Sequence, residues 1–201
     1  VALSATASSG LSVSFAVGSG AATITGGTNL SFMGAGSVSI VASQAGDETW
    51  NPAPSVTNTF TVAKASASVT LGNLSQTYDG TARMATASTL PEGLSVSFTY
   101  DGSVVAPVNA GSYAVTGTVN STMYQGGANG MLVVAAANQT IAFPAIGNQI
   151  TTNTVALEAT TSSGLSVSFA VGSGAATITG GTNLSFSGAG SVSIVALQGG
   201  D

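Results

Sequence analysis

The sequence has 201 residues, of which only 4% are charged, with two Lys or Arg residues against seven Asp or Glu, and it contains no His and no Cys. So few cations argue against nucleic acid as a partner, because phosphate binding depends on a high density of Lys and Arg. Without His or Cys, and with so few charged residues, the chain lacks the side chains that form a catalytic nucleophile and its general base. We therefore expect that the protein is not an enzyme and has no cofactor or metal site. The apolar residues never form a run of about 18, which argues against membrane insertion in this segment.

The first part of the sequence is repeated near its end. Residues 1–47 and 155–201 match without gaps at 42 of 47 positions. Such repetition is typical of fibres, stalks and multivalent binders rather than of catalytic domains. Because both ends cut through the repeated region, we expect the chain to be a segment of a longer repetitive polypeptide. The five differing pairs are Ser4/Glu158, Ala7/Thr161, Met33/Ser187, Ser43/Leu197 and Ala45/Gly199.

Short β-strands are predicted along the whole chain. In residues 11–17 (LSVSFAV) every second residue is large and apolar and the others are Ser or Ala, which is the period of a half-buried strand. The same alternation predicts strands at 37–42 and 112–119, and no segment has the 3.6-residue apolar period of a helix. Gly-rich turns are expected between strands at 18–20, 26–27 and 34–36.

Two Tyr-Asp-Gly sequences predict tight turns in the middle of the chain. Asp79-Gly80 and Asp101-Gly102 each follow a Tyr. Because Gly accepts a positive φ and Asp tolerates it, both pairs are predicted to form two-residue hairpin turns.

A second, weaker repeat divides the period into two related modules. The sequence SSGLSVSFAV (8–17) is echoed by PEGLSVSFTY (91–100), and FTVAKASASVTL (60–71) is echoed by LVVAAANQTIAF (132–143). About seven short strands in each 70 to 80 residues indicate small two-sheet sandwiches of antiparallel strands.

Three modules are therefore predicted. The first A module, residues 1–65, lacks its opening strand; the B module is residues 66–137; the second A module, residues 138–201, lacks its terminal strand.

The B module resembles the MBG/YDG-type repeat domains of large bacterial surface and secreted adhesin-like proteins. The similarity lies in TYDGTA (77–82), PEGLSVSFTYDG (91–102), APVNAGSYAV (106–115) and MYQGGANGMLVV (123–134). Module A is similar to the immunoglobulin-like modules that alternate with such domains. The resemblance implies an all-β fold of tandem immunoglobulin-like antiparallel β-sandwich modules in an extended array. It also implies an extracellular or cell-surface location, and it supplies neither catalytic residues nor a ligand.

Two aromatic residues and one acidic pair are candidate sites. Trp50 and Tyr124 stand at equivalent places before the terminal strand of their modules, so we expect core anchors; a sugar-stacking platform is the alternative. Asp47-Glu48 is expected in a turn, and the alternative is a cation site, although Ca²⁺ takes six to eight oxygen ligands.

Two further alternatives concern single side chains. Asp79 and Asp101 could form a carboxylate pair for glycoside hydrolysis, but their turn positions favour a structural role. Lys64 shares a strand face with Phe60 and Val62, which permits an isopeptide bond to an Asn or Asp; module B has Ala136 at that place.

The junctions between modules predict how the array behaves. Neither 60–71 nor 132–143 contains a flexible linker, so we expect a stiff rod of roughly 30 to 40 Å per module. The leading hypothesis is a non-enzymatic structural repeat region of a large bacterial extracellular or cell-surface protein, acting as a stiff stalk or fibre in adhesion or matrix. One alternative is a set of adhesin modules that bind glycan or a surface receptor multivalently. Another is a self-assembling extracellular filament, joined through edge strands or module ends that few charges protect.

Overall fold

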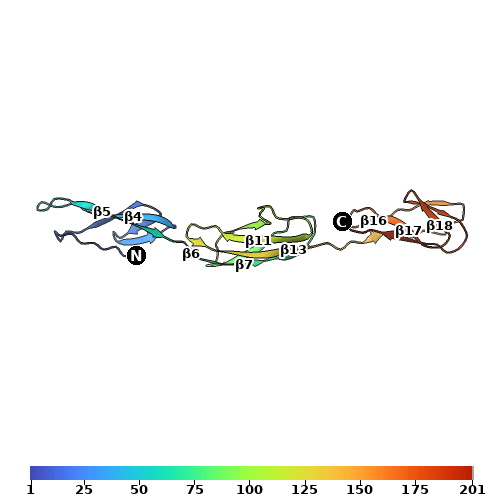
Figure 1. The fold of residues 1–201 in the computed structure, drawn as a ribbon, viewed down its shortest axis with the longest axis horizontal. Helices are drawn as coiled ribbons and strands as arrows, with labels where there is room; N and C mark the ends of the chain where they lie inside the picture. Colours follow the sequence, from blue (N-terminus) through green and yellow to red (C-terminus); the bar gives the residue numbers. More distant parts are fainter. Residues whose placement is uncertain (201) are drawn as a thin grey trace. The chain divides into compact units, whose positions relative to one another are not determined.

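The computed structural model describes residues 1–200, and these are all-β (Figure 1). They form strands β1 to β20 without any helix, which confirms the predicted all-β class. Accordingly, residues 1–200 offer no helix long and apolar enough to cross a bilayer. The chain divides into two compact units, Val1–Ala136 and Ala137–Asp201, which are described one after the other.

The first A module carries an antiparallel sheet in the order β1-β4-β5 and a separate hairpin, β2-β3. Gly26 and Gly27 both have positive φ and make the hairpin turn, as the sequence predicted. The strands are β1 (Ser14–Ser19), β2 (Ala22–Thr25), β3 (Asn29–Phe32), β4 (Gly36–Gln44) and β5 (Ala53–Val62).

The core of this module lies between the sheet and the hairpin. The buried residues at its centre are Ala22, Leu30, Val38 and Ile40. The rings of Phe32 and Phe60 pack edge to face with centroids 6.0 Å apart, which ties the hairpin to β5.

The predicted turn at 18–20 is partly wrong. Strand β1 continues to Ser19, and its register with β4 shifts between Val17 and Ser19, so Gly18 lies in a β-bulge. The chain turns only after this point, at Gly20, where φ is +94° and a Cβ would lie 2.3 Å from the Ser37 carbonyl oxygen. Glycine is needed there for both reasons.

The B module contains a four-stranded sheet in the order β10-β11-β13-β8 and a two-stranded sheet, β7-β9. The strand β11 covers the predicted segment 112–119 with one extra residue. The strands are β7 (Ser68–Gly72), β8 (Ser75–Thr77), β9 (Thr86–Leu90), β10 (Val96–Tyr100), β11 (Gly111–Val119) and β13 (Gly127–Ala135). Two short strands, β6 (Ala65–Ser66) and β12 (Tyr124–Gln125), form a pair of their own.

The prediction of purely antiparallel sheets is wrong at two places. Strand β8 pairs with β13 in parallel, and β6 pairs with β12 in parallel. In both cases a strand from the beginning of the module lies beside one from its end, so the connection between them is long enough for a parallel arrangement.

The core of the B module is centred on β11 and β13. Its buried residues are Ala85, Tyr100, Val115, Leu132 and Val134. The Tyr100 hydroxyl accepts a hydrogen bond from the backbone N–H of Ala85 at 2.9 Å, so the polar end of this buried side chain has a partner.

The second unit contains three small sheets: β14-β16, β15-β19-β18 and β17-β20. Leu184 and Leu157 are its most buried residues. The strands are β14 (Ile141–Ala142), β15 (Thr154–Ala156), β16 (Thr160–Thr161), β17 (Ser168–Ser173), β18 (Ala176–Thr179), β19 (Asn183–Phe186) and β20 (Ser193–Leu197).

Candidate functional site

The junction between the first A module and the B module is held by a short parallel strand pair, β6-β12. The Ala65 N–H donates to the Met123 carbonyl at 2.8 Å, and the Ala67 N–H donates to the Gln125 carbonyl at 2.8 Å. These two bonds fix the connecting residues on both sides, so the junction is not a free linker.

A loop of the B module also contacts the first A module directly. The Ala35 N–H donates to the Thr122 carbonyl at 3.0 Å, and the Thr122 hydroxyl donates to the Met33 carbonyl at 3.5 Å. The Lys64 ammonium donates to the Ser121 carbonyl at 2.7 Å. The Lys64 amine is thus hydrogen-bonded to a backbone carbonyl, and not placed against the Asn or Asp side chain that the isopeptide alternative requires.

One glycine makes the close pairing of β6 with β12 possible. A Cβ on Gly126 would lie 2.1 Å from the carbonyl oxygen of Ala67 and 3.0 Å from its carbonyl carbon. No side chain fits at such a distance from backbone atoms, so the junction geometry requires glycine at this position.

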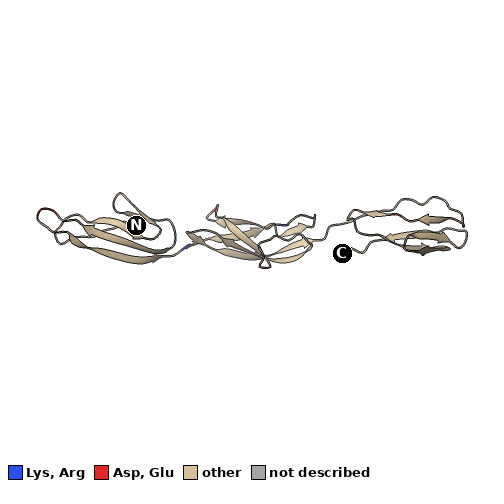
Figure 2. Cartoon of the chain, turned by 90° about the horizontal axis from the view of Figure 1, so that it is seen from above, with Lys and Arg blue, Asp and Glu red and all other residues tan. Residues whose placement is uncertain are grey.

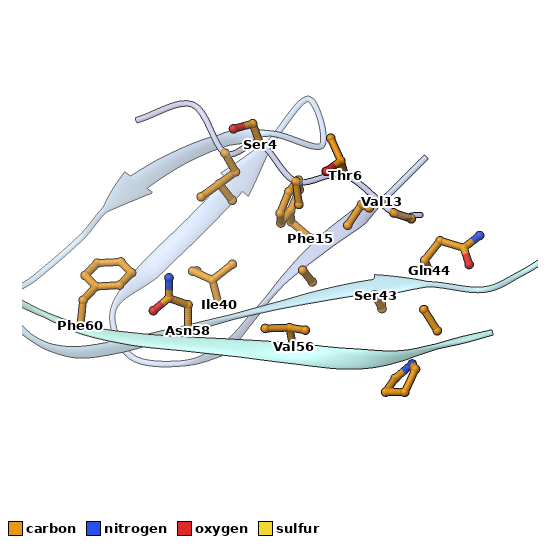
Figure 3. Close-up of a pocket in the computed structure, with 16 residues that line it drawn as sticks. Ser4, Thr6, Val13, Phe15, Ile40, Ser43, Gln44, Val56, Asn58 and Phe60 are labelled. Atoms are coloured by element: carbon orange, nitrogen blue, oxygen red, sulfur yellow. The ribbon is translucent and has the colours of Figure 1, made fainter. Parts of the chain in front are cut away.

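A groove of about 400 Å³ runs across the first A module, between the segment that precedes β1 and the sheet β1-β4-β5 (Figure 3). Figure 3 shows Ser4, Thr6, Val13 and Phe15 on one side of the groove, with Ile40, Val56 and Asn58 on the strands across from them. The lining is mainly apolar, and its polar atoms come from neutral side chains such as Gln44. The groove therefore suits an extended, largely apolar polypeptide better than a charged ligand.

The predicted turn at Asp101-Gly102 is present between β10 and the following residues. Asp101 and Gly102 have φ values of +47° and +83°, and Tyr100 and Ser103 exchange both backbone hydrogen bonds, at 2.7 and 2.8 Å. The Asp101 carboxylate also accepts the Ala114 N–H at 2.8 Å. This carboxylate therefore ties the turn to strand β11.

The predicted hairpin at Asp79-Gly80 is wrong. Strand β8 before it pairs with β13, and β9 after it pairs with β7, so the turn does not join neighbouring strands. Instead the Asp79 carboxylate accepts hydrogen bonds from the Thr81 N–H at 2.9 Å and the Thr81 hydroxyl at 2.6 Å, and it forms an ion pair with Arg83. These hydrogen bonds hold Asp79 in a local turn, and this turn forms in place of the predicted hairpin.

The pKa of Asp79 is lowered from its usual value, first by the hydrogen bond from the Thr81 hydroxyl, then by the Thr81 N–H and Arg83. Because the pKa is lowered in the folded state, the stabilisation is present above the unfolded pKa of about 3.9 and is lost as the pH falls through the folded value. Replacing Thr81 by Val should raise the Asp79 pKa, measured by NMR titration of the side-chain carboxyl. A Thr70→Val control in β7 should leave it unchanged, and an equal rise in both variants would contradict the assignment.

The expectation that Trp50 is a core anchor is wrong. Its side chain is 51% exposed in the loop between β4 and β5. The loop is organised by Asp47, whose carboxylate accepts the N–H groups of Thr49 and Trp50 at 2.8 and 2.9 Å. Asp47 thus caps a turn, and residues 1–200 contain no group of three or more acidic side chains that could hold a metal ion.

Tyr124, the other expected core anchor, lies at the junction. It is half-buried in β12, opposite Ala65 of β6. Its place in the chain before a terminal strand corresponds to that of Trp50, yet the two residues have different surroundings. Equivalent positions in sequence have not produced equivalent positions in space.

Charged side chains are few, and most of them lie in the first unit (Figure 2). Arg83 forms an ion pair with Asp79, and Lys64 donates to the Ser121 carbonyl. Neither cation is therefore part of a broad basic surface. The Asp79 carboxylate is bound to Thr81 and Arg83, and the Asp101 carboxylate is bound to the Ala114 N–H, so both carboxylates have structural partners.

The junction residues Ser121, Thr122 and Gly126 were not singled out by the sequence. The one local signal is the pair Gly126-Gly127 directly before a strand, which is typical of a close backbone approach. The partners of these residues lie about sixty or more positions earlier in the chain, beyond the reach of a local pattern.

The strand order and the duplicated A module define an all-β repeat protein. The family model described as MBG domain matches residues 67–138, which contain β7 to β13. This part of the chain is similar to the MBG domain, and it is called the MBG domain from here on. No curated protein matches the chain.

Proposed function

We propose that the chain is a stiff, non-enzymatic repeat region of a large bacterial cell-surface or secreted protein, built from tandem immunoglobulin-like β-sandwich modules. In this role it acts as a stalk or fibre in adhesion or in an extracellular matrix. The observation that carries the proposal is the hydrogen-bonded junction between the first A module and the MBG domain. Two modules joined by paired strands and by a second contact bend less than modules on a free linker.

The composition supports an exposed location. Without His or Cys, no side chain has an unperturbed pKa between about 5 and 8, so the fold is insensitive to pH across that range. The low number of charged groups also makes the modules insensitive to salt.

Distance measurements across the junction test the proposal. The chain has no cysteine, so Thr59→Cys in β5 and Ser112→Cys in β11 provide two unique, exposed sites for spin labels. Pulsed electron paramagnetic resonance should give one narrow distance distribution in the full chain. A broad distribution, like that of a flexible linker, would contradict a stiff junction.

A second candidate function is self-assembly into a filament, and β10 supports it. This strand lies at the edge of the four-stranded sheet β10-β11-β13-β8. Its sequence, VSFTY, contains no charged residue. Unprotected edges of this kind favour pairing with another strand.

Sedimentation at increasing protein concentration tests this second function. We expect association that Ser97→Lys in β10 weakens, because a charge on an edge strand opposes pairing. Met84→Lys, at an exposed position outside any strand, should leave association unchanged. A chain that stays monomeric at the highest concentration contradicts filament formation.

A further inference from the structure

All four methionine side chains of the chain are exposed to solvent. The exposed fractions are 57% for Met33, 60% for Met84, 43% for Met123 and 52% for Met131. Methionine more often fills gaps in an apolar core, because its side chain is flexible and its thioether is polarizable. In residues 1–136, by contrast, the buried residues of the two cores include no Met. Since the chain has no Cys, its only sulfur atoms lie at the surface.

Two of these methionines lie at the junction and contribute to it through their backbone. The Met33 carbonyl accepts the Thr122 hydroxyl at 3.5 Å, and the Met123 carbonyl accepts the Ala65 N–H at 2.8 Å. The Met123 N–H in turn donates to the Ser121 hydroxyl at 3.1 Å. A chemical change at either sulfur atom leaves these backbone groups in place.

The other two methionines lie within the MBG domain. The Met84 carbonyl accepts hydrogen bonds from the side-chain amides of Asn73 and Gln76, both at 3.0 Å. Met131 lies in β13 next to the fully buried Leu132, so its side chain points away from the core. In both cases the backbone is part of the fold and the thioether is at the surface.

The second A module shows that the Met33 position accepts a polar side chain. The counterpart of Met33 there is Ser187. The Met33 N–H donates to the Ala21 carbonyl at 2.9 Å, and the Ser187 N–H donates to the Ala175 carbonyl at 2.9 Å. The local backbone is therefore the same whether the side chain is a thioether or a hydroxyl.

We propose that the four methionine side chains are surface sites for oxidation by peroxide, and that the modules and their junction persist when all four are oxidised. In each reaction the sulfur attacks one oxygen of hydrogen peroxide. The S–O bond forms as the O–O bond breaks, the sulfur loses two electrons, and the proton of the transferred oxygen joins the departing hydroxide to form water. The product is methionine sulfoxide, whose polar oxygen disrupts an apolar core but is hydrated at a surface. Peroxide is thereby consumed at the surface while the cores are spared.

Treatment of the full chain with hydrogen peroxide tests the proposal. Under conditions that fully oxidise free methionine, the intact mass should rise by four oxygen atoms, and peptide mapping should place one oxygen on each Met. Each thermal unfolding midpoint should stay within about 4 °C of its value before oxidation. The Ala65 and Ala67 N–H groups, which donate across the junction, should keep their protection from hydrogen exchange. A methionine that stays unoxidised, a larger fall in a midpoint, or loss of this protection overturns the proposal.

Leu132→Met provides the matched control, because it places a thioether in the core with little change in volume. In the folded chain this buried sulfur should resist peroxide, so the folded variant also gains only four oxygen atoms. If both chains are oxidised in denaturant and then refolded, the variant gains a fifth oxygen. Its MBG transition should then fall by about 8 °C or more, because a sulfoxide is buried, whereas the original chain should unfold at its usual midpoint. Equal falls in the two chains, or a fifth oxygen gained by the folded variant as fast as the other four, would mean that burial does not decide the outcome and would overturn the proposal.

Discussion

Replacing Gly126 by Ala should loosen the junction between the first A module and the MBG domain while both remain folded. The new Cβ would lie 2.1 Å from the Ala67 carbonyl oxygen, so the Ala67 backbone has to move away from β12. This displacement breaks the Ala67–Gln125 hydrogen bond and weakens the neighbouring Ala65–Met123 bond. At about 1 kcal/mol for each backbone hydrogen bond, the loss of one bond and the weakening of the other should cost the junction between about 1 and 2 kcal/mol.

The measurement is the distance distribution between spin labels at Thr59→Cys and Ser112→Cys. It should change from narrow to broad in the Gly126→Ala chain, and circular dichroism should show unchanged strand content. Gly147→Ala is the matched control, because a Cβ there meets nothing within 4 Å. An unchanged distribution in the Gly126→Ala chain would mean that the β6-β12 pair does not set the stiffness.

The largest loss of stability is expected for Leu132→Ala in the MBG domain. Leu132 is fully buried in the middle of β13 and belongs to the same core as Val115 and Tyr100. Truncating a buried Leu removes apolar burial and leaves a cavity, at a cost of about 2 to 5 kcal/mol. Chemical denaturation followed by circular dichroism should therefore show a lower midpoint for the MBG transition.

The neighbouring residue provides the control for this experiment. Met131 is 52% exposed on the opposite face of β13, so Met131→Ala should cost about 1 kcal/mol or less. If the two variants lost equal stability, β13 would not have the inward and outward faces that the structure assigns to it.

The strands could be predicted from the sequence because their signal is local. In β11 the apolar residues alternate with Ser, Thr and Gly, and the buried positions Val115 and Val119 follow that alternation. The turn at Asp101-Gly102 was equally accessible, because its two residues have the backbone preferences that the turn requires. The B module was also recognisable, since its motifs stand in the order and spacing of the MBG domain.

The pairing of distant strands could not be predicted in the same way. Strands β8 and β13 lie nearly sixty residues apart in the sequence. The alternation of apolar and polar residues within a strand shows which of its faces is buried, but it does not show which strand pairs with it or whether the pair is parallel. The same dipeptide, Asp-Gly, gives a hairpin turn at 101–102 but not at 79–80, where Thr81 and Arg83 bind the Asp79 carboxylate. The exposure of Trp50 likewise depends on how its loop folds, because the equivalent loop of the B module holds Tyr124 half-buried.

The surface that residues 141–143 cover in the second unit could not be predicted either. The strand pairing of β14 with β16 and the Phe143–Phe169 contact identify this surface, and both join residues about twenty or more positions apart.

The parallel pairing of β8 with β13 determines how the MBG domain responds to mechanical force. If the chain is pulled from both sides, tension acts on β8 from its N-terminal end and on β13 from its C-terminal end. Because the two strands run in the same direction, this pull slides one along the other and loads their hydrogen bonds together rather than one at a time. The four-stranded sheet thus has its first and last strands in sequence, β8 and β13, in a shear arrangement, which resists extension better than a hairpin that opens from one end.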